Sequence, residues 1–286
     1  MTEQIKDLII KNKPNISKSS IITYASILKN LHYKIFGDEI EISNFNKAND
    51  VLKFLDDVPA NKRKTILSAL VVITDNKKYR EQMLKDIETY KENESTQLKN
   101  NKQSESWVDI ETIEAIYNKL ESNAKVIYKK KSLTSIDLQE IQNFIILCIL
   151  SGKYIPPRRS KDYVDFKIKG IDPEKDNYLY KKNMIFNSYK TAKTYARQEL
   201  PVPNELMKIL NKWIKINPTD YLLFDSNLKQ LSNVKLTQRL NKIFGKKASV
   251  NQLRHTYLRK LWVQVLLKKK YILRKIKPYK QILILI

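Results

Sequence analysis

The sequence predicts a mostly α-helical protein with a small antiparallel sheet, divided into two domains. The chain has 286 residues, which is long enough for one large or two ordinary domains. It contains only 4 Gly and 9 Pro, a composition that favours long helices over a sheet protein with many turns. Residues 91–106 hold one apolar residue and have the composition of a linker. We therefore expect domains at 1–92 and 107–286, joined by a linker at 93–106.

The first domain is predicted to consist of four helices. Residues 15–36 place apolar side chains at helical spacing on one face, as an amphipathic helix does. Three later segments show the same pattern, and Pro59 ends the first of them. These three segments are residues 51–58, residues 61–73 and a helix that carries Tyr79 and Tyr90.

The second domain is predicted to combine helices with the sheet. Asp109 is a good N-cap for a helix that runs to Leu120, because its carboxylate can accept from free backbone N–H groups. The apolar segment 138–150 should be the buried central helix of this domain. Four short segments separated by charged turns predict the antiparallel sheet: 165–168, 178–180, 183–186 and 198–202. Helices resume at 204–216, at 236–244 and from residue 250 onward.

The charge of the chain indicates a polyanionic partner. The formal net charge is +24, and the sequence pI is about 9.8. Nucleic acid is the first candidate, because the lysines are spread along the whole chain and do not form a membrane anchor. No apolar run reaches membrane-spanning length, and the N-terminus lacks a secretion signal. We expect an intracellular protein that is not secreted and binds no membrane.

Cysteine and histidine are too few for a metal centre or a disulfide framework. The one cysteine, Cys148, lies in the apolar run FIILCIL and is expected to be a buried small hydrophobic residue. The only histidines are His32 and His255. We therefore expect no metal site in this chain.

Three segments in the second domain contain the residues best suited to chemistry. They are LCILSGKYIPPRRSKDY at 147–163, NSYKTAKTYARQELPVP at 187–203 and VNQLRHTY at 250–257. In this order they supply an arginine, a lysine, a second arginine and a histidine. Two guanidinium groups can hold a phosphodiester and neutralise the charge that grows in its transition state. A lysine can protonate a leaving oxygen, a histidine can act as acid or base, and a tyrosine can be the nucleophile.

These segments resemble the catalytic domain of the tyrosine recombinases, or phage-type integrases, and specifically the divergent versions of large DNA viruses and their satellite elements. Arg159-Ser-Lys-Asp162 fits the Arg-x-x-Asp motif of the family, with Arg158 as the alternative first arginine. Lys190 matches the family's hairpin lysine, and Lys193 is the second choice.

The second arginine box and the helical first domain extend the resemblance over most of the chain. Residues 251–255 read Asn-Gln-Leu-Arg-His, where the family has His-x-x-Arg-His, so Arg254 is the second arginine. Asn251 replaces the first histidine of the box, and an amide cannot transfer a proton at neutral pH. His255 follows the arginine and in the family more often supports the site. The helical first domain is similar to the family's core-binding domain, which contacts DNA.

The C-terminal tail departs most from the family pattern. From about residue 259 it contains no Gly, Ser, Asp, Glu or His, as if the reading frame had changed or the element were truncated. The family's nucleophilic tyrosine belongs in this region. Tyr279 lies closer than Tyr271 to the expected position and is our candidate nucleophile.

The resemblance implies cleavage and rejoining of DNA through a 3′-phosphotyrosyl intermediate. Arg159 and Arg254 would hold the scissile phosphate, and Lys190 would protonate the leaving 5′ oxygen. Asp162 would orient an arginine from the second shell of the site. The resemblance also implies double-stranded DNA as partner, a homo-tetramer on paired DNA sites, and no ATP, metal or small-molecule substrate. It places the protein where its DNA is (cytoplasm, viral factory or nucleus). Arg158 and Lys193 are expected to contact DNA.

Two other functions remain open at this point. The unusual tail and Asn251 are compatible with a catalytically impaired DNA-binding remnant of such a recombinase. The same residue set also suits a monomeric enzyme similar to type IB topoisomerases, which would relax supercoils without site preference.

Overall fold

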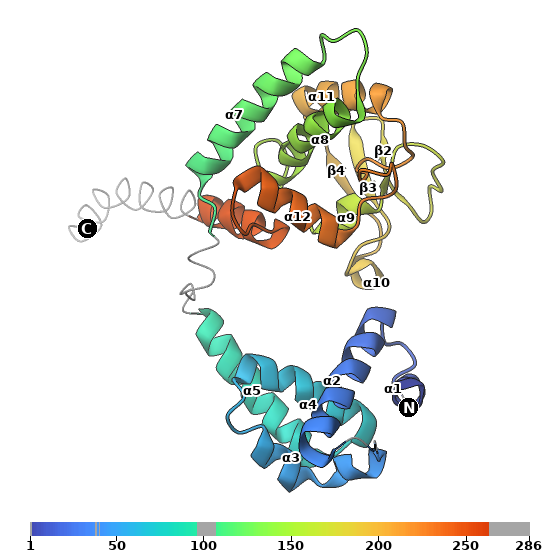
Figure 1. Cartoon of the computed structure of the whole chain (residues 1–286), viewed down its shortest axis with the longest axis vertical. Helices are drawn as coiled ribbons and strands as arrows, with labels where there is room; N and C mark the ends of the chain where they lie inside the picture. The colour runs from blue at the N-terminus through green and yellow to red at the C-terminus, as the bar shows by residue number, and fades with distance from the viewer. Residues whose placement is uncertain (1, 38, 40, 96–106, 263–286) are drawn as a thin grey trace, which may run out of the picture. The chain divides into compact units, whose positions relative to one another are not determined.

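The fold class predicted from the sequence is confirmed. The structure is a computed structural model that describes residues 2–37, 39, 41–95 and 107–262. Its backbone divides into two compact units, an N-terminal unit of residues 1–100 and a C-terminal unit of residues 101–286. Helices predominate, and the four-stranded sheet lies in the C-terminal unit (Figure 1).

The described residues of the N-terminal unit form helices joined by turns and short loops. A cluster of apolar side chains from these helices forms its core. Ser17 begins the second helix, where its hydroxyl accepts a hydrogen bond from the Ser20 N–H at 3.1 Å. The helices are α1 (Thr2–Asn12), α2 (Lys18–Phe36), the 3-10 helix η1 (Ile42–Asn46), α3 (Ala48–Phe54), α4 (Ala60–Thr74) and α5 (Lys77–Ser95).

Helix α1 was not predicted from the sequence. It buries Ile5 and Ile9, which lie one turn apart on the same face, and it packs against α2 and α4. A helix of 11 residues with only two buried side chains gives a weak periodic signal, so the tertiary contact reveals this helix. The core also holds Tyr79, whose hydroxyl donates to the carbonyl of Phe45 at 2.7 Å and ties α5 to η1.

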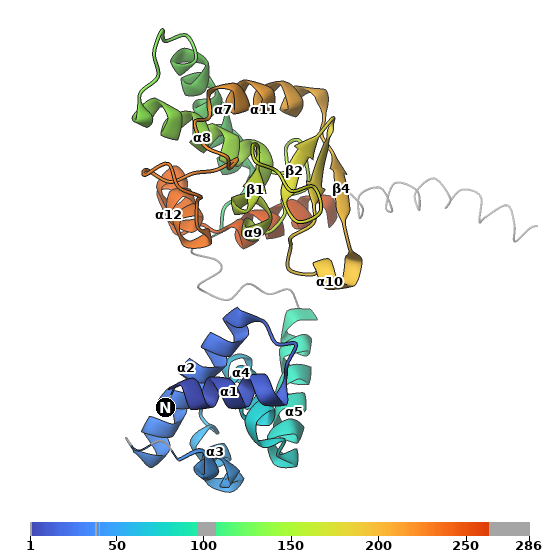
Figure 2. The ribbon, with the colours of Figure 1, turned by 90° about the vertical axis from the view of Figure 1, so that its right-hand side faces the viewer.

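The C-terminal unit combines its sheet with helices, and the sheet lies toward one side of the unit in Figures 1 and 2. Its first helix begins at the predicted cap, because the Asp109 carboxylate accepts from the Thr112 N–H at 2.7 Å. The next helix starts earlier than predicted, at a capping box of Thr134 and Asp137. The helices are α7 (Ile110–Ile127), α8 (Ser135–Leu150), α9 (Ser160–Val164), α10 (Ala192–Tyr195), α11 (Asn204–Ile216) and α12 (Asn233–Phe244), followed by helical residues 250–262.

Helix α8 is the buried central helix that the sequence predicts. Residues 144–150 are all buried, including Cys148. Helix α8 packs against α7 and α11, which lie beside it in Figure 2. Among the described residues no helix is both long and apolar enough to cross a membrane.

The sheet has the strand order β1-β2-β3-β4, from β1 (Phe166–Lys167) through β2 (Asn177–Tyr180) and β3 (Asn183–Phe186) to β4 (Gln198–Pro201). Strands β2, β3 and β4 pair antiparallel as predicted, whereas β1 joins β2 in parallel. The loop between β1 and β2 carries the chain back to the end of the sheet where β1 begins, so the two strands run in the same direction. Residues 187–197 connect β3 and β4, and α10 lies at the far end of this connection in Figures 1 and 2.

Candidate functional site

Two adjacent arginines, Arg158 and Arg159, follow Pro156 and Pro157 in the segment that connects α8, which ends at Leu150, with α9. Proline has no N–H to donate and restricts the residue before it to extended backbone. Arg159 has extended backbone, with φ −71° and ψ 156°, and occupies the N-cap position of α9. The side chains of Arg158 and Arg159 both reach one pocket of the C-terminal unit.

Arg158 is held in place by an acid and by two aromatic rings. Its Nε donates to Oδ2 of Asp162 at 2.9 Å, one helical turn further along the chain. Its guanidinium carbon lies 4.1 Å from the ring centroid of Phe186 and 5.3 Å from that of Tyr189. The structure therefore pairs Asp162 with Arg158, whereas Arg159 makes no side-chain hydrogen bond to any described residue.

Arg254 reaches the same pocket from the helical segment 250–262. This segment is anchored by Leu253, which is buried in the core, and by Thr256, whose hydroxyl donates to the Val108 carbonyl at 2.7 Å. Arg254 Nε donates to the Pro157 carbonyl at 3.3 Å, and Nη1 donates to Oδ1 of Asn251 at 3.4 Å. Both bonds are long for N–H···O hydrogen bonds, so the guanidinium remains under-satisfied.

The electrostatics of the pocket reflect the close approach of like charges. Burial lowers the pKa of Arg254, and the positive charge of nearby Arg159 lowers it further. Burial raises the pKa of Asp162, although the attraction of Arg158 opposes this rise. Oδ1 of Asp162 is buried and has no hydrogen-bond partner. Three guanidinium groups thus share one carboxyl group.

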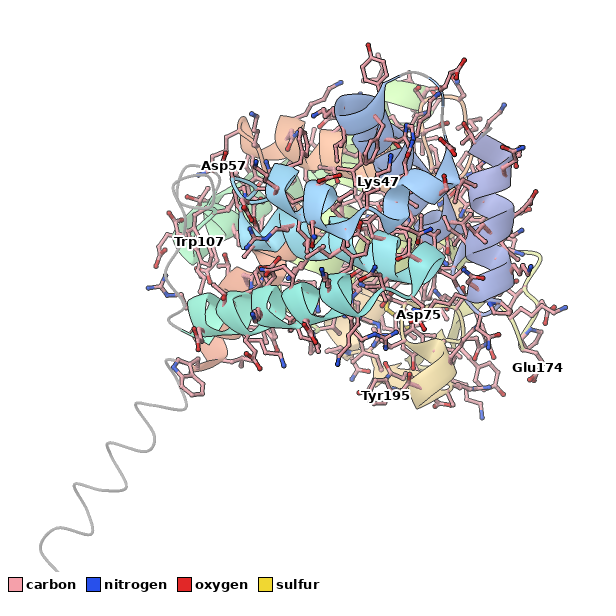
Figure 3. All side chains as sticks on the ribbon, turned by 90° about the horizontal axis from the view of Figure 1, so that it is seen from below. Lys47, Asp57, Asp75, Trp107, Glu174 and Tyr195 are labelled. Atoms are coloured by element: carbon pink, nitrogen blue, oxygen red, sulfur yellow. The ribbon has the colours of Figure 1, made fainter. Side chains whose placement is uncertain are left out.

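The pocket has a volume of about 530 Å³ and is open to solvent. Besides the three arginines and Asp162, its lining includes tyrosine side chains from the β3–β4 connection and from the last described helix. Tyr195 lies on α10, where Figure 3 labels it, and is 65% exposed. The other lining residues are Pro156, Pro157, Tyr189, Thr191, Gln198, Tyr257 and Leu258.

The predicted lysines lie beside this pocket and not in its lining. Lys190 follows β3 and is exposed, between two residues that do line the pocket, Tyr189 and Thr191. Lys193 is also exposed, on α10. Both neighbours of Lys190 in the chain therefore belong to the pocket lining.

The remaining predicted residues have different positions. Asn251 is exposed and contacts Arg254, as described above. His255 is exposed and does not line the pocket. Tyr279, the candidate nucleophile, lies outside the described residues.

Sequence reasoning missed residues that shape the pocket without carrying charge. Gly152, with φ +77°, leaves room for the ring of Tyr257, because a Cβ there would lie 2.3 Å from Tyr257 Cδ2. Because the chain contains only four glycines, the sequence could have marked Gly152 as a position where the fold requires glycine. Asn177, which is fully buried at the start of β2, gave no signal in the sequence.

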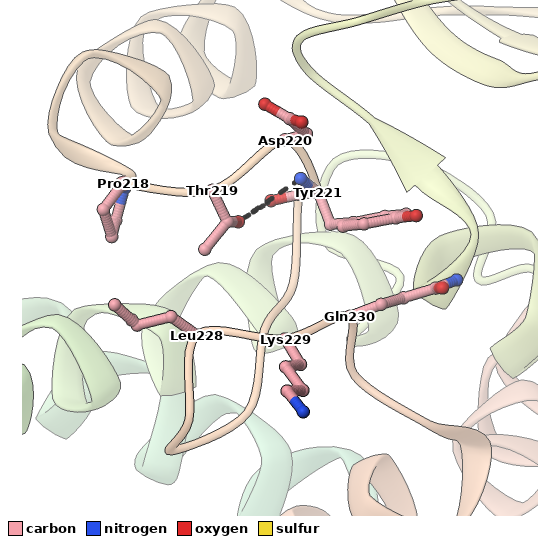
Figure 4. A pocket seen from close by; sticks show the side chains of 7 residues that line it. All are labelled: Pro218, Thr219, Asp220, Tyr221, Leu228, Lys229 and Gln230. Atoms are coloured by element: carbon pink, nitrogen blue, oxygen red, sulfur yellow. Dashed lines mark hydrogen bonds between the residues drawn. The ribbon is translucent and has the colours of Figure 1, made fainter.

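A second pocket in the same unit lacks these charge properties. It has a volume of about 450 Å³ and lies between two loops, with the lining side chains shown in Figure 4. Its charged members are one acid, Asp220, and one base, Lys229. This balanced lining gives no reason to expect an anion there. Among the described residues, no group of three or more His, Cys, Asp or Glu side chains is placed to hold a metal ion.

Comparison with known proteins identifies the fold. No protein-family model and no curated protein sequence matches the chain. Among solved structures, a dimer of a lambda integrase fragment bound to a COC′ core site matches with a TM-score of 0.50 and 16% sequence identity. That match covers 90% of this chain and 88% of the other. A lambda integrase fragment bound to DNA matches with a TM-score of 0.50 and 14% identity, over 90% and 85% of the two chains.

The chain has a tyrosine recombinase fold. At 14–16% identity the similarity concerns the fold and not the individual residues. The roles of individual residues therefore rest on the geometry of the pocket.

Proposed function

We propose that this protein is a site-specific DNA recombinase that cleaves and rejoins DNA through a 3′-phosphotyrosyl intermediate. The observation that carries the proposal is the convergence of Arg158, Arg159 and Arg254 on one pocket with a single carboxyl group, Asp162. These arginines come from segments about a hundred residues apart in the chain. A phosphodiester would supply the anionic oxygens that the guanidinium groups lack.

The proposed roles follow from how each side chain is held. Arg159 and Arg254, which have free or long-bonded N–H groups, would bind the two non-bridging oxygens of the scissile phosphate. Arg158 is committed to Asp162 and to the aromatic rings, so it would add positive charge and position α9. This assignment supports Arg159, and not Arg158, as the first arginine of the motif.

The proposed reaction is a transfer of the phosphoryl group between oxygens. A tyrosine hydroxyl loses its proton to solvent and its oxygen attacks phosphorus, and the bond to the 5′ oxygen breaks while Lys190 donates a proton to that oxygen. A 5′ hydroxyl later reverses these steps and releases the tyrosine. Tyr279 remains our candidate nucleophile, and His255 and Asn251 are proposed to support the phosphate site. Because the phosphotyrosyl bond conserves the energy of the phosphodiester, we propose that neither ATP nor a metal is required.

Double-stranded DNA is the proposed partner. The net charge of +24 favours DNA binding with steep salt dependence. The two lambda integrase structures of the same fold are described as bound to a core site and to DNA. We propose residues 1–92 as a core-binding domain, residues 107–286 as the catalytic domain, and assembly as a homo-tetramer on paired sites. A viral or mobile element is the proposed genetic context.

Covalent trapping tests the proposal. The purified full chain is incubated with nicked duplexes from the ends of its own genetic element, and products are separated by denaturing electrophoresis. We expect a protein–DNA adduct whose peptide map identifies a tyrosine. Salt-sensitive DNA binding without any adduct would instead support the impaired remnant. Relaxation of an arbitrary supercoiled plasmid would support the topoisomerase-like alternative.

A further inference from the structure

Asn177 is a fully buried polar residue at the start of β2, and its side chain uses all of its hydrogen-bonding capacity on the backbone. Its Nδ2 donates to the carbonyl of Asp162 at 3.1 Å and to the carbonyl of Ser188 at 2.8 Å. Its Oδ1 accepts from the N–H of Asn187 at 2.9 Å and from the N–H of Ser188 at 2.8 Å. One amide therefore connects three segments that are separate in sequence.

The bonded segments are the ones that carry the charges of the site. Asp162 belongs to α9 and pairs with Arg158, and α9 starts at Arg159. Ser188 lies two residues before Lys190, at the point where the chain leaves β3. The amide of Asn177 thus spans from the arginine side of the pocket to the turn that presents Lys190.

A second amide strengthens the turn but does not reach the arginines. Nδ2 of Asn187 donates to the carbonyls of Pro173 and Asp176, at 2.7 and 3.0 Å. These bonds fix the turn to the loop that precedes β2. Among the described residues, the side chain of Asn177 is the one that forms hydrogen bonds both with this turn and with α9.

We propose that Asn177 is a positioning residue that sets the distance between the arginine pocket and Lys190. The proposal rests on the proposed function, because it assigns Lys190 to the phosphate held by Arg159 and Arg254. Lys190 itself has no side-chain hydrogen bond to a described residue, so its reach depends on where its backbone is held. A shift of about 1 Å in a reacting group can reduce a rate about a hundredfold.

The chain offers a matched control in Asn217, which is also buried. Its Nδ2 donates to the carbonyls of Tyr221 and Leu222, at 3.0 and 3.3 Å. Its Oδ1 accepts from the N–H and the hydroxyl of Thr219, both at 2.9 Å. Asn217 therefore makes four hydrogen bonds in the same unit, but none of them involves a segment that lines the arginine pocket.

The first test compares Asn177→Ala with Asn217→Ala in the full chain, at a temperature where both variants are folded. The rate of adduct formation is measured at saturating nicked DNA, and the Kd for the same DNA is measured separately. We expect Asn177→Ala to slow adduct formation about a hundredfold relative to Asn217→Ala, with a similar Kd for both. Equal rates in the two variants would overturn the proposal, because Asn177 would then serve the fold alone.

A second variant, of the same size as the wild-type side chain, covers the case in which Asn177→Ala does not fold. In Asn177→Asp the carboxylate can still accept from the N–H groups of Asn187 and Ser188, but it cannot donate to the carbonyls of Asp162 and Ser188. We expect this variant also to form the adduct more slowly than Asn217→Ala, because the link to α9 is lost. A rate equal to that of the wild type would contradict a positioning role for that link.

A second measurement separates this proposal from the proposed function. Lysines are acetylated with acetic anhydride in the presence and absence of duplex DNA, and the modified positions are mapped by mass spectrometry. We expect DNA to protect Lys190 in the wild type and in Asn217→Ala, but not in Asn177→Ala, with Lys229 as an unprotected reference. This readout remains valid if the wild type forms no adduct. Protection of Lys190 that is absent from the wild type, or unchanged in Asn177→Ala, would refute the proposal.

Discussion

Arg63 in the N-terminal unit and Arg254 in the C-terminal unit are both partly buried, but their surroundings differ. Arg63 binds both oxygens of Asp86, through Nε and Nη2, each at 2.9 Å. Its Nη1 donates to the carbonyls of Leu55 and Asp56, at 3.3 and 3.0 Å. Within the described part of the chain, Arg254 makes two long hydrogen bonds and has other guanidinium groups as neighbours.

The two environments shift the pKa of arginine in opposite directions. The hydrogen bond to Asp86 raises the pKa of Arg63, and its charge is therefore favoured by the fold. Burial and the charge of Arg159 lower the pKa of Arg254, which stays charged but is less favourably placed than in water. The comparison shows that the charge of Arg63 is compensated by Asp86, whereas the charge of Arg254 has no such compensation among the described residues, which is why we propose that it binds an anion.

The largest effect is expected for Arg254→Ala on the reaction. Loss of one donor to the developing charge should slow formation of the covalent DNA adduct about 100- to 1000-fold. The free energy of unfolding should change by less than about 1 kcal/mol, because the wild-type side chain has no carboxylate partner of its own. Adduct kinetics and urea denaturation measure the two quantities. A large loss of stability would show that Arg254 resembles Arg63 after all.

The reverse pattern is expected for Arg63→Ala. Removal of the guanidinium leaves the buried Asp86 carboxylate without its bidentate partner, which should lower the free energy of unfolding by about 3 kcal/mol. The rate of adduct formation per folded molecule at saturating DNA should remain near that of the wild type. Denaturation curves of Arg63→Ala and Arg254→Ala, recorded under identical conditions, check this contrast.

A smaller effect is expected from a pair of glycines, one in each unit. In Gly152→Ala the new Cβ would meet the Tyr257 ring at 2.3 Å in a left-handed backbone, so we expect a loss of about 2 kcal/mol. In Gly37→Ala nothing lies within 4 Å of the Cβ, and the loss should be about 1 kcal/mol from the positive φ alone. Only Gly152→Ala should also slow adduct formation, because Tyr257 lines the arginine pocket. Equal effects of the two variants on stability and on the rate of adduct formation would contradict a role for Tyr257 in the site.

Local sequence patterns predicted most of the fold. The spacing of apolar residues predicted the longer helices of both units except α1, but not the short helices α9 and α10, and Asp109 marked the start of α7 at the correct residue. Helix α1 escaped prediction because the role of its two buried isoleucines is evident only from the contact with α2 and α4. The parallel pairing of β1 with β2 depends on the path of a loop, which periodicity does not report.

The site was predictable where charge carried the signal. Arg158, Arg159, Asp162 and Arg254 were recognisable as candidates, and the structure brings them together around one pocket. Which arginine pairs with Asp162 was not predictable, because the position of Arg158 depends on its contact with the ring of Phe186. Asn177 was invisible for a similar reason, since its four partners are backbone groups of other segments.

The salt dependence of DNA binding tests most directly whether the arginine pocket holds a backbone phosphate. The Kd for duplex DNA is measured over a range of salt concentrations for the wild type, Arg254→Ala and Arg63→Ala, which lose the same formal charge. We predict that the slope of log Kd against log salt concentration becomes shallower by about 0.9 in Arg254→Ala, because one phosphate contact is lost. The slope should not change in Arg63→Ala. An unchanged slope in Arg254→Ala, or the same change in both variants, would contradict a phosphate site in this pocket.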